Sequence, residues 1–482
     1  MKHLASRLIS VAGILTLILG SVASHAAPAK DNRSLAHDVF KQLIEINTTD
    51  SVGNNTTAAR AMMQALLDGG FPAADLQVIG PTERKGNLVA RYRGKTGSRL
   101  KPILIIGHLD VVEARREDWT TDPFQFTEKD GFYYGRGTQD MKVNDAIIVA
   151  NFVRLHQEGY VPSRDIILAL TSDEETGPAN GVDWLLKNHR NLIDAEYVIN
   201  PDAGGVATEH GKPLSVEFEA SEKLYADYQL LATGSGGHSS LPTTDNPIYH
   251  IAHALVALEQ APFPFELNPV TRSYFEEIAK RSTPEVAADL RSILTNPPDS
   301  DAIRRLSTDP RYNSTMRTTC VATLQSGGHA VNALPQRGEA NVNCRIFPGH
   351  SQEEIRLELI RRFNDPALTV RYRSDSGELA DHGSTRAAMA PPPLHPDVMR
   401  ALRNTAATLW PGVPVIPEME TGASDSIYTM SENIPSYGIS GIAVERNDHR
   451  EHGRDERVAV KSFYDGLEFY YQFLKAVSSE KK

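Results

Sequence analysis

The sequence predicts an α/β protein into which a smaller α+β domain is inserted. Apolar strands alternate with helices in residues 27–221 and again in residues 377–482, which indicates a largely parallel central sheet. Residues 222–376 follow the order strand, helix, strand, strand, helix, strand, which is that of a compact ferredoxin-like unit. We therefore expect a discontinuous outer domain that carries the inserted unit as a second domain.

The first 26 residues have the pattern of a secretory signal peptide. Lys2 and Arg7 precede the apolar run LISVAGILTLILGSVA, and small residues follow up to Ala26, where we expect cleavage. The apolar run is short for a membrane span, although an uncleaved anchor stays an alternative. The mature chain is thus expected to be exported, to the periplasm or the medium, without membrane contact.

Length and charge limit the classes of function. The 482 residues suffice for two or three domains with a sizeable core. The formal net charge is −11, and this argues against nucleic acid or an anionic membrane surface as a partner.

The outer domain starts with two expected helices and then alternates strands with helices. Ser34 is the expected N-cap of the first helix, residues 34–49. Residues 102–110 include a continuous apolar run, which suits a strand buried on both faces. The other elements expected before residue 222 are helices at 56–67, 144–160 and 181–189 and strands at 76–80, 87–94, 165–177 and 195–205.

The inserted domain contains the six elements of the ferredoxin-like order. They are strands at 223–234, 317–327, 339–349 and 367–374 and helices at 247–260 and 351–363. Between the first helix and the second strand, residues Pro262 to Asn313 are rich in Pro, Asp and Arg, and we interpret them as a partly helical insertion. The outer domain then resumes with a helix at 397–410.

Two cysteines occur, Cys320 and Cys344, in strand-like segments on either side of a turn region near Asn332. An exported protein meets oxidising conditions. We hypothesise a disulfide across a hairpin, with two free buried thiols as the alternative.

Acidic and imidazole side chains follow the predicted strands at their carboxyl ends. In open α/β sheets these ends form the ligand-binding crevice, so the side chains are expected to meet there. They are His108 and Asp110 after one strand, Glu174 and Glu175 after the next, Asp202 after a third, Asp140 in a glycine-containing loop, and His449 and His452 near the C-terminus. Asp173 is interpreted as a helix-capping or solvated acid.

Carboxylates crowded in this way need a cation to offset repulsion and desolvation. Nitrogen and oxygen ligands without thiolate suit zinc or a similar divalent transition metal. Two histidines and three acids exceed the needs of one catalytic metal. They fit a pair of metals bridged by one carboxylate, about 3.5–4 Å apart as in two-metal hydrolases.

Five motifs of this chain are similar to those of a known family. GHLDVV, YGRGTQDMK, SDEETG, GHSSLP and HGRDE resemble, in order and general spacing, the motifs of the di-zinc metallopeptidases. That family includes aminoacylase, acetylornithine deacetylase, succinyl-diaminopimelate desuccinylase and glutamate carboxypeptidase. The resemblance covers nearly the whole mature chain. It implies a zinc-peptidase-like catalytic domain, with the inserted domain serving as a lid and a dimerisation surface.

The resemblance also implies the ligands of the metal pair. His108 and Asp202 would bind zinc, Asp140 would bridge the two ions, and Glu175 and His452 would complete the set. The cofactors implied are two Zn²⁺ per chain, with Co²⁺ or Mn²⁺ as substitutes. The HGRDE motif favours His452 over His449 as the ligand.

Two further acids receive roles in the reaction. By the resemblance, Glu174 is the general base that takes a proton from the activated water and passes it to the leaving amine. Asp110 would orient His108, because a metal-bound histidine usually needs such a partner.

Five residues are implied in substrate contact. His238 of GHSSLP would stabilise the oxyanion, commonly in the other subunit of a homodimer, although some relatives are monomers. Asn332 is a further candidate, and Arg345 would bind a substrate carboxylate, with an ordinary strand-edge ion pair as the alternative. Gly422 and Ser424 lie in a segment that resembles the glycine-rich loop near that carboxylate.

The leading hypothesis is an exported zinc-dependent hydrolase of amide bonds, carboxypeptidase-like on short peptides or aminoacylase-like on N-acyl amino acids. One alternative is a di-zinc aminopeptidase of the related branch without a lid, against which the inserted domain and GHSSLP speak. Another is a binding protein or inactive relative, against which the retained base and ligands speak. Substrate identity is left open.

Overall fold

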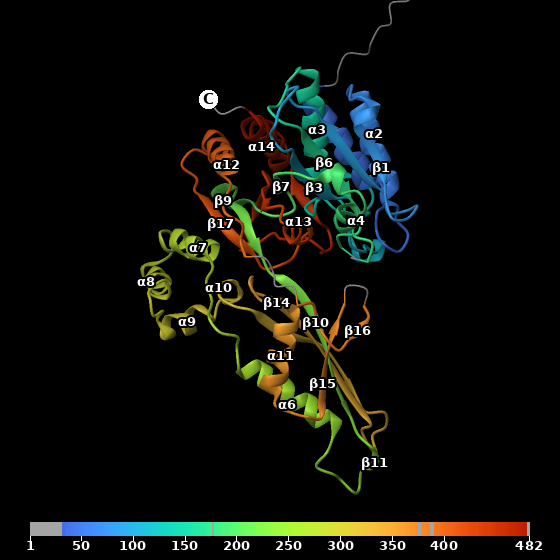
Figure 1. Ribbon diagram of the computed structural model, residues 1–482, viewed down its shortest axis with the longest axis vertical. Helices are drawn as coiled ribbons and strands as arrows, with labels where there is room; N and C mark the ends of the chain where they lie inside the picture. Colours follow the sequence, from blue (N-terminus) through green and yellow to red (C-terminus); the bar gives the residue numbers. More distant parts are fainter. Residues whose placement is uncertain (1–30, 176–177, 375–376, 386–389, 480–482) are drawn as a thin grey trace, which may run out of the picture.

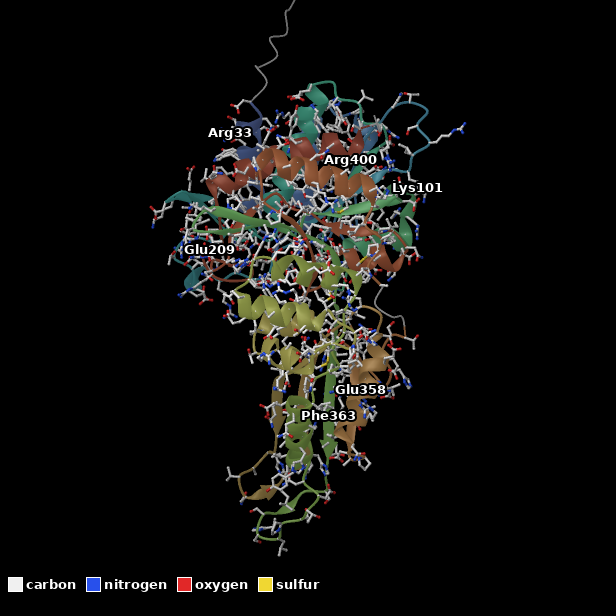
Figure 2. The ribbon with its side chains drawn as sticks, turned by 90° about the vertical axis from the view of Figure 1, so that its left-hand side faces the viewer. Arg33, Lys101, Glu209, Glu358, Phe363 and Arg400 are labelled. Carbon is white, nitrogen blue, oxygen red and sulfur yellow. A yellow bond between two sulfur atoms is a disulfide. The ribbon has the colours of Figure 1, made fainter. Side chains whose placement is uncertain are left out.

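Two sheets, each with its own helices, lie one above the other along the long axis of the molecule (Figure 1). The computed structural model describes residues 31–175, 178–374, 377–385 and 390–479. The predicted signal peptide lies outside the described residues. Figure 2 shows the same two parts from the side, with Arg400 in the larger domain and Phe363 in the smaller one.

Within the described residues, the larger domain is built on a sheet of ten strands. Its order is β1-β2-β6-β3-β7-β18-β9-β8-β19, and β17 pairs with β9. The strands are β1 (Leu76–Ile79), β2 (Asn87–Tyr92), β3 (Ile103–His108), β6 (Ile166–Thr171), β7 (Tyr197–Asn200), β8 (Gly205–Glu209), β9 (Lys212–Glu222), β17 (Val415–Glu420), β18 (Ser436–Gly438) and β19 (Ala443–Glu445).

The sheet is parallel at its centre and antiparallel at several flanking pairs. Strands β6, β3, β7 and β18 run parallel, whereas β2 pairs antiparallel with β6 and β8 with β9. A two-residue turn at His210 and Gly211, both with positive φ, joins β8 to β9, and such a hairpin can only be antiparallel. The expected α/β class is confirmed, with a more mixed sheet than the pattern predicted.

Both faces of this sheet are covered, as the continuous apolar run in β3 predicts. Ile103 and Ile105 face the main core, whereas Leu104 and Ile106 pack on the opposite side. Successive side chains point to opposite faces of a strand, so both faces need a cover. The covering helices are α1 (Asn32–Glu45), α2 (Asn55–Asp68), α3 (Lys142–Gln157), α4 (Gly181–Asn188), α5 (Arg190–Ile193), α12 (Pro396–Leu409), α13 (Ser426–Ser431) and α14 (Val460–Ser478).

The first helix begins earlier than predicted. Asp31, rather than Ser34, is the N-cap of α1, and its side chain accepts hydrogen bonds from the backbone N–H groups of Arg33 and Ser34. Both residue types are good caps, and the structure selects Asp31, which directly precedes the first helical residue, Asn32, and lies three residues before Ser34.

The smaller domain confirms the ferredoxin-like prediction. Its antiparallel sheet has the order β12-β14-β10-β15-β16, and α6 and α11 pack on one face through Tyr228, Leu230 and Val342. Its elements are β10 (Leu224–Thr233), α6 (Pro247–Gln260), β12 (Thr319–Gly327), β14 (Arg337–Ile346), α11 (Gln352–Phe363), β15 (Leu368–Arg373) and β16 (Leu379–Ala380). At its far end β11 (Gly237–His238) pairs with β13 (Ala333–Leu334) (Figure 1).

The hypothesised disulfide between Cys320 and Cys344 is confirmed. The two residues lie directly opposite each other in the β12–β14 pair. The bond links the outer strand of the smaller sheet to its neighbour.

The insertion between Pro262 and Asn313 forms helices, as interpreted. Each helix starts with a capping residue followed by Pro or Ser, namely Asn268, Thr283, Asp299 and Asp309. Their apolar faces form one cluster with Ile416 of β17, so the insertion packs against the larger domain. The helices are α7 (Pro269–Ala279), α8 (Pro284–Ile293), α9 (Ser300–Leu306) and α10 (Pro310–Thr315).

The larger domain also contains a small three-stranded sheet among its described residues. Strands β4 (Thr127–Lys129), β5 (Phe132–Tyr134) and β20 (Arg457–Ala459) pair in it.

Within the described ranges, no helix combines the length and the apolar composition that crossing a bilayer requires.

Candidate metal centre and active site

The carboxyl ends of three adjacent strands bring the predicted ligands together. Strand β3 lies between β6 and β7, and all three run parallel. His108 ends β3, Glu174 and Glu175 follow β6, and Asp202 follows β7. Parallel strands end at the same edge of a sheet, so side chains far apart in the sequence converge there.

Five predicted ligands form two groups that share Asp140. Nε2 of His108 lies 2.9 Å from Oδ1 of Asp140 and 3.4 Å from Oδ1 of Asp202. Nε2 of His452 lies 3.0 Å from Oδ2 of Asp140 and 3.0 Å from Oε2 of Glu175. Each oxygen of the Asp140 carboxylate therefore belongs to a different group.

The two groups fit a pair of divalent metal ions. Ligand atoms bound to one tetrahedral Zn²⁺ lie roughly 3.3 Å apart, since each bond is about 2.0–2.1 Å long. The nitrogen–oxygen distances in the two groups range from 2.9 to 3.4 Å. The donors are imidazole nitrogen and carboxylate oxygen, which suit zinc, cobalt or manganese. The donor set and its spacing thus suit a divalent ion in each group, and Asp140 would belong to both groups.

His108 is oriented by a backbone carbonyl. Its Nδ1 lies 3.0 Å from the carbonyl oxygen of Asp110, to which Nδ1–H donates, so Nε2 is left to face Asp140. The sequence assigned the orienting of His108 to Asp110, and the Asp110 carboxylate lies farther from Nδ1 than the carbonyl does, at 3.9 Å. It accepts instead the backbone N–H groups of Glu174 and Glu175, at 3.2 and 3.0 Å. Asp110 thereby positions both glutamates.

The loop that carries Asp140 is held by Glu456. One oxygen of this fully buried carboxylate accepts the N–H groups of Gln139 and Asp140, at 2.6 and 3.1 Å. The other accepts the N–H of Gly137 at 3.0 Å and pairs with Arg136 at 2.6 Å. Charged acceptors form stronger hydrogen bonds than neutral ones, so Glu456 fixes the position of Asp140.

Two residues of the site, Asp173 after β6 and the last ligand, His452, have an uncommon backbone conformation. A buried ion pair fixes the first of them. Asp173 has φ of 70° and His452 has φ of 60°, values that are uncommon for residues other than glycine. Asp173 is fully buried, pairs with Lys85 and accepts the N–H of Ala179 at 2.7 Å. The sequence suggested a helix-capping or solvated acid. Asp173 is instead buried, and Asn180 caps the following helix α4, so Asp173 is a structural anchor. His449 lies outside the ligand groups, in an exposed pair with Glu451.

Burial and mutual repulsion dominate the electrostatics of the site. Burial raises the pKa of Glu174 well above its usual range; His108 opposes this rise, and Asp202 and Asp425 add to it. Burial also raises the pKa of Asp202, against the pull of His108. Burial acts on the pKa of Asp140 in the same sense, but hydrogen bonds from His108 and His452 lower it by more. This excess of carboxyl groups favours the binding of cations.

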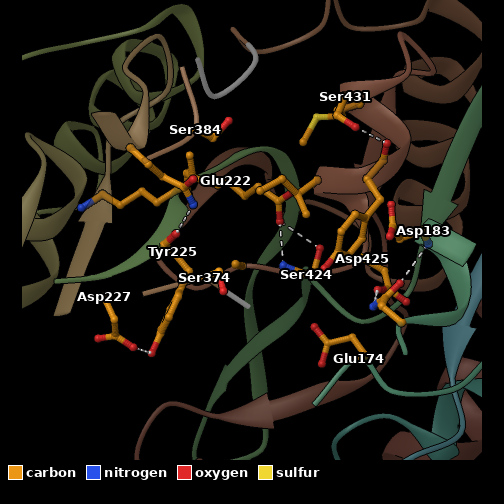
Figure 3. Close-up of a pocket in the computed structure, with 18 of the residues that line it drawn as sticks. Glu174, Asp183, Glu222, Tyr225, Asp227, Ser374, Ser384, Ser424, Asp425 and Ser431 are labelled. Atoms are coloured by element: carbon orange, nitrogen blue, oxygen red, sulfur yellow. Dashed lines mark hydrogen bonds between the residues drawn. The ribbon is translucent and has the colours of Figure 1, made fainter. Parts of the chain in front are cut away.

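A large cavity of about 1090 Å³ opens beside the ligand groups, between the two domains. Glu174 faces it, with oxygen within 4.8 Å of the ligand atoms of His108 and Glu175. Figure 3 shows Glu174 and Asp425 on one side of the cavity and Tyr225 on the other. Arg345, predicted to contact substrate, lines the wall of the smaller domain, with its guanidinium 4.8 Å from the centre of the Tyr225 ring.

The other four predicted substrate contacts fall into two sets. Ser424 lines the large cavity, and Gly422 lines a smaller cavity next to it, of about 480 Å³. The N–H of Gly422 donates to Glu420 at 3.0 Å. His238 and Asn332 are exposed at the far end of the smaller domain, on neighbouring segments, and line neither cavity beside the metal ligands. The structure does not bring them to the ligand groups of the same chain.

Sequence reasoning missed several residues that support the site. Glu222, at the junction of the two domains, accepts hydrogen bonds from the N–H and Oγ–H of Ser424, both at 2.9 Å (Figure 3). Asn200 donates to Ser424 and accepts the N–H of Asp202 at 3.2 Å. Glu456 is the last residue of the HGRDE motif, so the motif could have identified it as part of the site. Glu222 and Asn200 belong to none of the five motifs.

Comparison with known proteins places these features in a family. The model of peptidase family M20/M25/M40 matches residues 104–476. Probable carboxypeptidase S-like 2 of Dictyostelium discoideum is 30% identical over 405 residues, which cover 81% of this chain and 74% of that protein. N-fatty-acyl-amino acid synthase/hydrolase PM20D1 of Homo sapiens is 26% identical over 477 residues, covering 94% and 90%.

A solved structure shows the same fold. The M20 family metallo-carboxypeptidase Sso-CP2 from Sulfolobus solfataricus superposes with a TM-score of 0.68 at 17% identity, covering 92% of this chain and 99% of that one. The match includes the smaller domain, which disfavours the branch without a lid. The fold, the ligand groups and these matches define a metallopeptidase or amidohydrolase, an enzyme that hydrolyses C–N bonds. The chain belongs to peptidase family M20/M25/M40.

Proposed function

We propose that this enzyme is exported and hydrolyses the amide bond between an acyl or aminoacyl group and an amino acid that has a free carboxylate. The observation that carries the proposal is the Asp140 carboxylate, whose two oxygens face two separate ligand groups at the edge of the large cavity. Glu174 and Arg345 line that same cavity, so a base and a carboxylate-binding group share the space that opens beside the ligand groups.

In this proposal His108 and Asp202 hold one ion, His452 and Glu175 hold the other, and Asp140 contacts both. Two Zn²⁺ are the proposed ions, with Co²⁺ or Mn²⁺ as substitutes. When bound, such a pair polarises a carbonyl group and lowers the pKa of water towards ~7.

Glu174 is the proposed general base. Its carboxylate accepts the proton of the attacking water and returns it to the leaving amine, so one side chain serves both halves of the reaction. Asp110 supports this step because its carboxylate fixes the backbone N–H of Glu174 at 3.2 Å. The retained base and ligand set favour an active enzyme over an inactive binding relative.

Arg345 is the proposed partner of the substrate carboxylate. A guanidinium group matches a carboxylate with two parallel hydrogen bonds, and Arg345 is half-buried in the cavity wall. Leu186, Ile427 and Met430 form apolar parts of the opposite wall, which suits an apolar substrate side chain. The names of the relatives, a carboxypeptidase and an N-fatty-acyl-amino acid hydrolase, fit substrates of this class.

Removal of metal tests the proposed function. Dialysis against a chelator should abolish the hydrolysis of dipeptides and N-acyl amino acids, and added Zn²⁺, Co²⁺ or Mn²⁺ should restore it. The measurement is the rate of amine release from a panel of both substrate classes. Undiminished hydrolysis by metal-free protein would contradict the proposal, and so would inactivity of the metal-loaded protein on the whole panel.

The smaller domain is the proposed dimerisation surface. His238 and Asn332 are exposed at its tip, far from the ligand groups of their own chain, and β12 is the outer strand of its sheet with exposed Val321 and Leu324. Unpaired edges of this kind accept a partner strand. We expect sedimentation experiments to show a homodimer. We also expect the substitution His238→Ala to lower kcat. A monomer with full activity after His238→Ala would contradict the arrangement.

A further inference from the structure

A second cavity, here called the acidic chamber, adjoins the proposed metal centre. It has a volume of about 480 Å³ and shares Glu174, Glu175 and His452 with the large cavity, but it also reaches Asp140 and Asp202. Arg345 does not line it. The metal ligands thus stand at the boundary between two cavities, of which only the larger contains the group proposed for the substrate carboxylate.

The wall of the chamber is rich in carboxylates because two paired strands each contribute acids to it. Glu217 of β9 and Glu418 and Glu420 of β17 line the chamber. In the parallel β9–β17 pair, Glu418 lies opposite Glu219 and Glu420 lies opposite Glu222. Like charges directly opposite each other on neighbouring strands destabilise a sheet, so their presence here calls for a function.

Glu219 lies behind this wall, and one oxygen of its carboxyl group has no partner among the described residues. It is 2% exposed, and its Oε2 has no hydrogen-bond donor among the described residues. Its Oε2 lies next to Gly438, as does the side chain of Ala203, which lines the chamber. An unmatched buried carboxylate oxygen lowers stability unless a donor reaches it, which points to a cationic ligand.

Basic groups offset only part of this charge. Arg311, from α10 of the insertion, and Arg446 also line the chamber. Burial lowers the pKa of Arg311, while Tyr274, Glu217 and Glu418 raise it by more, so its guanidinium stays charged next to the acids. His449 and His452 line the chamber as well. Burial, and after it the neighbouring acids, still raise the pKa of Glu418 and of Glu219 well above the usual range, so a cationic ligand in the chamber would stabilise their ionised form.

We propose that the acidic chamber receives the free ammonium group of an unblocked short peptide. An ammonium group offers three hydrogen-bond donors and the opposite charge to the wall. A zwitterionic peptide would then lie across the site with its carboxylate end towards Arg345 and its ammonium end in the chamber. This inference rests on the proposed function and narrows its substrates: peptides with a free amino terminus are preferred over N-acyl amino acids.

A matched pair of substrates tests the preference. Glycyl-leucine and N-acetyl-leucine release the same leucine, and they differ by an ammonium group in place of one hydrogen. With metal-loaded enzyme, kcat/KM for glycyl-leucine is expected to be higher. Glu418→Gln should lower that value by about 10- to 100-fold, the worth of a hydrogen bond between charged groups, and should leave the value for N-acetyl-leucine within about 2-fold.

Controls separate a binding role from a structural one. Glu217→Gln should lower kcat/KM for glycyl-leucine as Glu418→Gln does. Glu209 is an exposed glutamate on β8 that lines neither cavity, so Glu209→Gln should leave kcat/KM for both substrates unchanged. Removing an acid from this repulsive wall should not lower the melting temperature. Binding is measured by calorimetry in the inactive Glu174→Gln variant. Adding Glu418→Gln to this variant should weaken the binding of glycyl-leucine and leave the binding of N-acetyl-leucine unchanged.

The outcomes distinguish the inference from the function on which it rests. Equal kcat/KM for the two substrates, or equal losses for both in Glu418→Gln, would overturn the inference and leave the proposed function intact. Hydrolysis of neither substrate by metal-loaded enzyme would contradict the proposed function, and the inference with it.

Discussion

Replacing Glu174 with glutamine is expected to lower kcat by about 10²- to 10⁴-fold without loss of metal, because general acid–base catalysis is worth a factor of that size. Glutamine has nearly the same shape but cannot accept a proton from water. Glu174 faces the large cavity, and the backbone contact from its N–H to Asp110, at 3.2 Å, does not depend on its carboxylate. The protein should therefore keep its fold and its bound ions.

The neighbouring residue provides the matched control. Glu175 lies 3.0 Å from His452, so Glu175→Gln should weaken metal binding, whereas Glu174→Gln should not. The measurements are kcat on dipeptides and N-acyl amino acids, together with metal content by mass spectrometry. If Glu174→Gln kept normal turnover, or lost metal as Glu175→Gln does, Glu174 would not be the base.

Replacing Glu456 with glutamine is expected to lower metal affinity by about 10- to 100-fold, the usual effect of losing a residue that orients a ligand. The glutamate accepts three backbone N–H groups and pairs with Arg136. The amide NH₂ of glutamine is itself a donor and cannot accept a hydrogen bond from the N–H group that it would face. Arg136, which is 3% exposed, would lose its charged partner. Breaking one partner from a buried ion pair destabilises by about 3–5 kcal/mol.

Two readouts and a control separate positioning from general destabilisation. At saturating Zn²⁺, Glu456→Gln should recover most of its kcat, because Glu456 touches Asp140 only through the backbone. Glu445 also accepts backbone N–H groups, from His210 and Gly211, but the hairpin that it holds carries none of the predicted metal ligands. Glu445→Gln should leave metal affinity unchanged. A Glu456→Gln variant that binds zinc as tightly as the parent would contradict the positioning role.

The strand ends were predictable from the sequence because the relevant pattern is local. Apolar runs that end in His108, Glu175 and Asp202 indicate parallel strands, and parallel strands place their last residues on one edge whatever lies between them. The alternation of strand and helix in the smaller domain is likewise local, and it gave the ferredoxin-like order. The pairing of Cys320 with Cys344 followed from their positions on either side of one turn.

Contacts made through pairing of distant segments were not predictable. Strands β9 and β17 are separated by about two hundred residues, so the facing acids Glu219 and Glu418 appear in the sequence as unrelated charges. Glu456 acts on a loop more than three hundred residues earlier in the chain. Asp110 contacts His108 through its backbone carbonyl, and a sequence does not show which group of a residue makes such a contact.

The central claim is that Asp140 bridges two metal ions, and anomalous X-ray diffraction from crystals of zinc-loaded protein measures this most directly. Each oxygen of Asp140 faces its own group, with His108 and Asp202 on one side and Glu175 and His452 on the other. We expect two anomalous peaks about 3.5–4 Å apart, one on each side of the carboxylate. A single peak, or two peaks that do not share Asp140, in crystals of active enzyme would contradict the claim.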